Sequence, residues 1–94
     1  MVVIVKFVGA FRGMSGKRKL TFELKETASL KLVVEEIVKK LPKLERILID
    51  PELEDPRPNT LILVNGKEIS VLNGLETSIK DGDEIVLVPV VHGG

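Results

Sequence analysis

The sequence predicts an α+β domain of the β-grasp type, a mixed sheet of four to five strands packed on one main helix. Two observations carry this prediction. Strand-like segments flank a single helical repeat of apolar residues, so one helix has to cover one face of a sheet. The last strand, Glu84 to Val90, is apolar after its first residue, which is typical of a central strand lying parallel to the first strand. A length of 94 residues allows one such domain and not two.

The first two strands are predicted to form a hairpin. Val2 to Val8 places alternate apolar residues on one face of a strand. From Leu20 to Leu24, apolar and polar residues alternate strictly, which indicates a second strand with one buried face. The connection between them, residues 9–16, contains three glycines and is expected to be a flexible loop.

Residues 30–41 are predicted to form the main helix. Their apolar side chains recur three or four positions apart and share one face: Leu30, Val33, Val34, Ile37, Val38 and Leu41. Ser29 is suited to cap the N-terminus. Because Pro42 cannot continue the helical hydrogen bonding, the helix should stop at Leu41.

The second half of the chain is predicted to contain a loop and three strands. Three prolines among acidic residues make 50–59 a stiff loop. Thr60 to Val64 is the third strand, and Asn65-Gly66 is a strong signal for a tight turn. The chain then returns as a short strand over Lys67 to Ser70. A turn at 81–83 leads into the last strand.

The predicted core joins one face of the strands to the apolar face of the helix. It consists of Val3, Val5, Phe7, Phe22, Leu24, Val33, Val34, Ile37, Ile85 and Leu87. If the odd-numbered residues of the last strand face the helix, the even-numbered ones face outward: Val86, Val88 and Val90. A second outward row comes from Leu61 and Leu63, or from Ile62 and Val64. An apolar face without a helix marks a protein interface, unless segment 44–59 or a neighbouring molecule covers it.

Composition excludes several classes of function. The chain has no cysteine, and therefore no disulfide, thiolate metal site or cysteine nucleophile. Fourteen basic residues balance fourteen acidic ones, which gives no electrostatic footprint for nucleic acid or an anionic membrane. The single histidine, His92, cannot form a metal cluster, and there is no tryptophan or tyrosine to stack on bases. We therefore expect no metal, no resident cofactor and no direct contact with nucleic acid or membrane.

Four further segments are expected to carry no separate function. The longest uncharged apolar run, Ile85 to Val91, is far too short to span a bilayer, and the first residues lack the features of a signal peptide. A cytoplasmic location is the expectation. The basic run Lys17-Arg18-Lys19 is expected to be a solvated hairpin edge. The acidic residues Glu52, Glu54 and Asp55 are expected to form a solvated loop and not a metal site.

The C-terminus is the most informative segment, because Pro89 is followed by three residues and then by Gly93-Gly94. Together with Leu63-Val64-Asn65-Gly66 and Asp81-Gly82-Asp83-Glu84-Ile85, this ending resembles the ubiquitin-like sulfur carriers. That family includes the MoaD and ThiS proteins, the ubiquitin-related modifiers and the small archaeal modifier proteins. The resemblance covers the whole chain and is strongest to MoaD, the small subunit of molybdopterin synthase. The ending His92-Gly93-Gly94 is similar to that of the ubiquitin-related modifiers.

The resemblance implies a carrier protein and not an enzyme. A separate adenylating enzyme, like MoeB, ThiF or the ubiquitin-activating enzymes, would use ATP to convert the Gly94 carboxylate into an acyl-adenylate. A sulfur donor would then convert it into a thiocarboxylate. In a MoaD-like protein, this thiocarboxylate donates its sulfur to a pterin precursor inside the large subunit of molybdopterin synthase. No side chain of the carrier itself is expected to be catalytic.

The same resemblance assigns roles along the chain. Residues 1–90 are expected to form the ubiquitin-like domain, and 91–94 a flexible tail. Gly93 and Gly94 form the reactive end, because residues without a Cβ let the backbone enter a narrow cleft. Partner contacts are expected at Val86, Val88, Pro89, Val90, Val91 and His92.

Two alternatives remain open at the level of sequence. In the first, the same tail makes the chain a modifier joined to lysines of other proteins, or a sulfur donor for tRNA thiolation. In the second, the chain is a binding-only β-grasp domain whose Gly-Gly ending is incidental. Deleting Gly94 discriminates between them, because the loss abolishes the carrier and modifier roles and spares the binding role.

Overall fold

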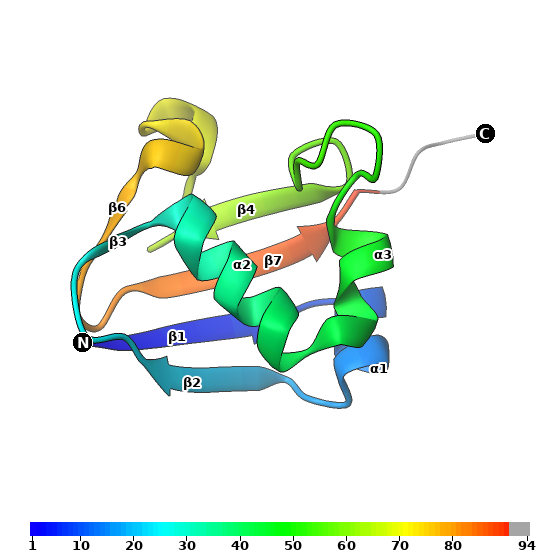
Figure 1. Ribbon diagram of the computed structural model, residues 1–94, viewed down its shortest axis with the longest axis horizontal. Helices are drawn as coiled ribbons and strands as arrows, with labels where there is room; N and C mark the ends of the chain where they lie inside the picture. Colours follow the sequence, from blue (N-terminus) through cyan, green and yellow to red (C-terminus); the bar gives the residue numbers. More distant parts are fainter. Residues whose placement is uncertain (91–94) are drawn as a thin grey trace.

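The structure is a computed structural model, and it describes residues 1–90 (Figure 1). Three elements are α-helices, five strands form the main sheet, and two short strands and three 3₁₀ turns complete the chain as described. In chain order they are β1 (Val2–Phe7), α1 (Ala10–Ser15), β2 (Lys19–Glu23), β3 (Ala28–Ser29), α2 (Leu30–Lys40), η1 (Pro42–Leu44), α3 (Glu45–Leu48), β4 (Thr60–Val64), β5 (Lys67–Glu68), η2 (Ile69–Val71), η3 (Gly74–Glu76), β6 (Ser78–Ile79) and β7 (Glu84–Pro89).

The main sheet has the order β2-β1-β7-β4-β5, and its centre is the pair formed by the first and last strands. β1 and β7 run parallel, with Val5 opposite Ile85, while β2 and β4 are antiparallel to their neighbours. This confirms the predicted β-grasp arrangement. β7 lies at the centre, between β1 and β4, where a strand rich in apolar residues is expected.

α2 lies across one face of the sheet, as Figure 1 shows. It begins where predicted, since the Ser29 hydroxyl accepts a hydrogen bond from the backbone N–H of Leu32 at 3.2 Å. It ends at Lys40, one residue earlier than predicted. Leu41 instead caps the helix and precedes Pro42, which starts a 3₁₀ turn.

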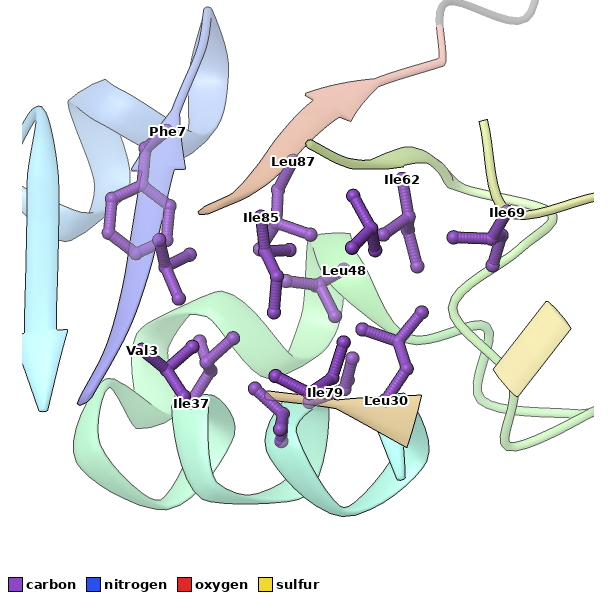
Figure 2. Close-up of a cluster of buried hydrophobic side chains, with 14 of the residues drawn as sticks. Val3, Phe7, Leu30, Ile37, Leu48, Ile62, Ile69, Ile79, Ile85 and Leu87 are labelled. Atoms are coloured by element: carbon purple, nitrogen blue, oxygen red, sulfur yellow. The ribbon is translucent and has the colours of Figure 1, made fainter. Parts of the chain in front are cut away.

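The core lies between α2 and the sheet (Figure 2). Nine of the ten residues predicted for it are buried, among them Ile37, Ile85 and Leu87 with no exposed surface. The tenth, Leu24, is only half-buried. β2 ends at Glu23, one residue before Leu24. The backbone N–H of Leu24 donates to the Met1 carbonyl at 2.8 Å, and its side chain lies at the margin of the sheet.

The expected flexible loop at 9–16 is wrong, because these residues contain α1. Phe11 anchors this short helix and is completely buried in the core. Gly16 ends it in the left-handed conformation, with φ of 70°, where glycine is favoured. A glycine-rich segment with one buried aromatic side chain is therefore an ordered element.

The second half of the chain is also more structured than predicted. The return strand β5 ends at Glu68 and passes into η2, so the expected strand to Ser70 is shorter. The predicted tight turn is present: Asn65 and Gly66 both have positive φ, 50° and 83°. β3 and β6, which the sequence did not indicate, pair as a two-stranded sheet beside the helix.

Segment 41–59 extends the helical layer and does not cover the outer face of the sheet. Leu44 and Leu48 are fully buried in the same core as α2, and Figure 2 shows Leu48 on the same side of the sheet as Ile37. The Leu48 carbonyl accepts a hydrogen bond from the buried hydroxyl of Thr60 at 3.1 Å. The sheet's other face consequently stays open along its central strands.

Candidate functional site at the end of the last strand

The chain leaves the sheet at the end of β7. Pro89 lies opposite Thr60 as the last paired residue, and the backbone N–H of Val90 donates to the Asn59 carbonyl at 2.9 Å. Five residues, Val90 to Gly94, follow Pro89 in the sequence. The predicted site residues Val91, His92, Gly93 and Gly94 lie outside the described residues.

Pro89 marks the place where β1 and β7 separate. The N–H of Val8 bonds the Leu87 carbonyl at 3.2 Å, and in a parallel ladder the next donor from β7 would be residue 89. Proline has no N–H, so the pairing with β1 ends there. Gly9 makes room for the proline ring: its φ is 58°, and a Cβ at this position would lie 3.2 Å from the Pro89 Cγ.

The open face of the sheet carries the apolar side chains that the sequence predicted to face outward. Val86 lies opposite Leu63, and Val88 lies opposite Leu61. We call these four residues the outer row. The sequence left open whether Leu61 and Leu63 or Ile62 and Val64 face outward. Leu61 and Leu63 do, because the alternate residues of β4 are buried against the helix.

The outer row is accessible and continues to the end of the strand. Leu61 is 38% exposed and Val90 41%, while Val86, Val88 and Leu63 are half-buried by one another. At the β1 side, Lys6 and Glu84 form an ion pair of 3.2 Å between two half-exposed side chains. The face therefore offers a strip of aliphatic surface with charges at its margin, leading toward Val90.

A second structured feature borders the exit point, on the loop between α3 and β4. The Arg57 guanidinium makes a paired hydrogen bond with the Asp55 carboxylate, with Nη2 2.5 Å from Oδ2. This hydrogen bond lowers the pKa of Asp55 and raises that of Arg57. Arg57, Leu61 and Val90 are among the residues that line a small pocket of about 160 Å³.

The described residues offer binding surface and no group of metal ligands. Within residues 1–90, no three His, Cys, Asp or Glu side chains come together as a metal site would need. Glu52 and Glu54 are exposed, and Asp55 is engaged with Arg57. Every helix in this part of the chain falls short of the length and apolar character that crossing a membrane requires.

The fold and the site together define a class of protein. A five-stranded β-grasp sheet, one main helix and a central last strand followed a few residues later by a Gly-Gly ending are the features of ubiquitin-like carriers and modifiers. The chain belongs to the ThiS family, whose model matches residues 5–94. It is thus a member of the ubiquitin-like sulfur carriers, as its sequence motifs indicate, and members of this family are small carrier or modifier proteins and not enzymes.

Individual relatives show different uses of this scaffold. The chain is 40% identical over 70 residues to a protein of Archaeoglobus fulgidus proposed to be a sulfur carrier, covering 68% of this chain and 76% of that protein. The solution structure of small archaeal modifier protein 1 from Methanosarcina acetivorans matches with a TM-score of 0.84 at 31% identity, covering 99% and 96% of the two chains. A Pyrococcus furiosus protein proposed to be subunit 1 of the molybdopterin converting factor matches with a TM-score of 0.77 at 28% identity, covering 97% and 99%.

Sequence reasoning missed two residues that shape the exit point. The sequence places Gly9 in an expected flexible loop, although a glycine shortly after a strand also indicates a turn with positive φ. Asn59, which accepts the bond from Val90, has no sequence signal, because the acceptor is its backbone carbonyl. Any residue type offers this group, so only the fold reveals it.

Proposed function

We propose that the chain is a sulfur carrier whose Gly94 carboxylate is adenylated by a MoeB- or ThiF-like partner and converted to a thiocarboxylate. The carboxylate attacks the α-phosphate of ATP and releases pyrophosphate, and the sulfur donor then displaces AMP from the acyl-adenylate. The observation that carries the proposal is the ThiS family match, which extends to residue 94 and so includes the Gly-Gly ending.

The geometry of the exit point supports this role. Five residues follow Pro89, and an extended chain of this length reaches at most about 18 Å. The rigid end of β7 therefore sets where Gly94 can be presented. The backbone N–H of Val90 is hydrogen-bonded to Asn59, and the Pro89 ring packs against Gly9. A partner that binds this end of β7 therefore meets the Gly94 carboxylate within a limited distance.

The outer row supplies the surface on which such a partner docks. Burying its aliphatic side chains provides affinity, at about 25 cal/mol for each Å² of apolar surface removed from water. Val88, Pro89 and Val90 lie along one continuous path from this row to the exit point. We include Val91 and His92 in the contact surface because the sequence places them between this path and Gly93.

The finer assignment is that the chain serves as the small subunit of a molybdopterin synthase. The similarity to MoaD in the sequence motifs and to the Pyrococcus furiosus structure supports it. In that role a second partner, the large subunit, receives the thiocarboxylate and passes its sulfur to the pterin precursor. Incubating the thiocarboxylated chain with purified large subunit and the precursor should then yield the dithiolene product.

The central experiment is ATP–pyrophosphate exchange with the adenylating enzyme encoded in the same genome. Deleting Gly93-Gly94 should abolish exchange. Gly94→Ala should slow it, because a Cβ restricts φ and crowds the carbonyl that is attacked. His92→Ala should stay within about tenfold of the wild type, a change of about 1.4 kcal/mol in the barrier. A loss in His92→Ala as complete as in the deletion would contradict a mechanism based on the tail carboxylate alone.

A second candidate function is attachment to lysines of other proteins, or sulfur donation for tRNA thiolation. The similarity to a small archaeal modifier protein favours the first of these. Intact mass spectrometry of the chain from its own cells separates the roles. The mass gain of a single oxygen-to-sulfur exchange supports the carrier, whereas a ladder of conjugates that disappears without Gly94 supports the modifier.

A further inference from the structure

Five exposed basic residues gather where α1 meets the end of α2. We call them the basic cluster: Arg12, Lys17, Arg18, Lys40 and Lys43. They come from segments 9–22 and 37–44, neither of which contains an acidic residue. Among residues 1–90 none of the five is part of an ion pair. This end of a chain with zero net charge is therefore locally positive.

The cluster is assembled from elements that are distant in sequence but in contact. Lys40 at the end of α2 extends over the ring of Phe22 on β2, with its Nζ 5.3 Å from the ring centre. Arg18 lies just before β2, and its carbonyl accepts a hydrogen bond from the Phe7 N–H at 2.9 Å. The neighbouring acid on α2, Glu36, is already engaged with Lys39 at 3.4 Å. Glu36 thus pairs with Lys39 and not with Lys40, and among residues 1–90 Lys43 forms no ion pair with Glu45, the exposed acid two positions after it.

A pocket with an apolar floor lies inside this cluster. It has a volume of about 260 Å³ and is lined by Met14, Ser15, Lys40, Leu41, Pro42 and Lys43. Met14 is 45% exposed, so its side chain is accessible to a partner. The lining combines aliphatic surface with two ammonium groups. It suits an apolar side chain that has carboxylates next to it.

We propose that this pocket and the basic cluster bind an acidic segment of a partner protein, with one apolar side chain inserted beside Met14 and Leu41. Carboxylates of the segment complement the lysines and arginines, which speeds encounter and fixes orientation. A peptide fits better than RNA, because all three aromatic residues of the chain are buried: Phe7, Phe11 and Phe22. No aromatic surface is therefore available for base stacking.

The pocket is connected through α1 to the end of β7. α1 begins directly after Gly9, and Gly9 packs against Pro89 at the end of β7. The pocket lies at the other end of α1, at Met14 and Ser15, so a partner bound there is one short helix away from the point where the chain leaves the sheet. The docking site is separate from the outer row, so it adds a second point of attachment. Its existence does not depend on the chemistry of Gly94.

Binding can be measured directly with a defined probe. The probe is a ten-residue peptide in which Leu-Phe is flanked on each side by four alternating Asp and Glu residues. Titrated into ¹⁵N-labelled protein, it should shift the amide signals of Met14, Leu41 and Lys43, and the affinity should fall as salt is raised. A control peptide with Ser-Ser in place of Leu-Phe should bind at least fivefold more weakly.

Charge-reversal variants locate the site. Lys17→Glu combined with Lys43→Glu should weaken peptide binding at least tenfold. The matched control is Lys67→Glu combined with Lys80→Glu, which makes the same change in net charge at the opposite end of the sheet and should stay within twofold. All four side chains are exposed, so the variants should keep the wild-type circular dichroism spectrum.

Three results would overturn the proposal. One is the absence of binding to wild-type protein, and another is equal weakening by both pairs of substitutions. The third is tighter binding of a single-stranded RNA of the same charge than of the acidic peptide, which would assign the cluster to nucleic acid. None of these measurements involves adenylation, so their outcome is independent of the test of Gly94.

Discussion

The two faces of β7 carry similar aliphatic side chains, but one face is buried in the core and the other is partly exposed. On the inner face, Ile85 and Leu87 have no exposed surface and pack against α2. On the outer face, Val86 and Val88 are half-buried and meet only their neighbours on the adjacent strands. Burial on one face gives the fold its stability, and the same hydrophobicity on the other face remains available to a partner. Hydrophobic residues in one strand can therefore serve two different purposes.

Truncating the inner face should have the largest effect of the changes considered. Ile37→Ala removes a completely buried side chain between α2 and the sheet and should lower the free energy of unfolding by about 2–5 kcal/mol. Leu32→Ala on the same helix is the control, because Leu32 is 46% exposed and should cost far less. Urea denaturation measures both. A loss below about 0.5 kcal/mol in Ile37→Ala would mean that the inner face is not a packed core.

A substitution at Gly9, beside the end of β7, should have the next largest effect on the free energy of unfolding. Gly9→Ala places a Cβ 3.2 Å from the Pro89 ring at a φ of 58°, so it should destabilise the fold by about 1–3 kcal/mol. Gly13→Ala is its control, since a Cβ there meets nothing within 4 Å and alanine favours the helix. Thermal denaturation should show a lower midpoint for the first and an unchanged or higher midpoint for the second.

The outer face should respond through binding and hardly through stability. Val88→Asp places a charge in the proposed interface, which should weaken docking to the adenylating enzyme and lower kcat/KM for exchange at least tenfold, about 1.4 kcal/mol. Val71→Asp makes the same chemical change at a side chain that is 72% exposed outside the sheet, and should be close to neutral. Equal activity of the two variants would remove the outer row from the interface.

The smallest effect is expected at the loop beside the exit point. Because Arg57 lowers the pKa of Asp55, the ion pair stabilises the folded state above the unfolded-state pKa, about 3.9. Asp55→Asn should cost about 0.2–1 kcal/mol at pH 7. The difference from wild type should shrink as the pH falls below 3.9 through the folded-state pKa. Glu52→Gln, which removes an exposed acid of the same loop, should show no such dependence in urea denaturation followed across pH.

Interactions between residues close in sequence determined the elements that have a strong sequence pattern. The repeat from Leu30 to Leu41, the Ser29 cap and the Asn65-Gly66 turn all act through nearby residues, and all three were predictable. α1 was not predictable in the same way. Its sequence has two glycines at its margins and one within, and what holds it is the burial of Phe11 in a core built by other elements.

The sequence alone also determined the order of the main strands and the family motifs, because hydrophobic periodicity, a breaking proline and two terminal glycines are properties of short segments. Only the tertiary structure decided which row of β4 faces outward, that Gly9 makes room for Pro89, and that Met14 and Lys43 share a pocket. An alternating strand of aliphatic residues is compatible with either face, so the choice rests with the helix that covers one of them. Contacts between residues far apart in the chain depend on the packing of the whole domain, which no local pattern encodes.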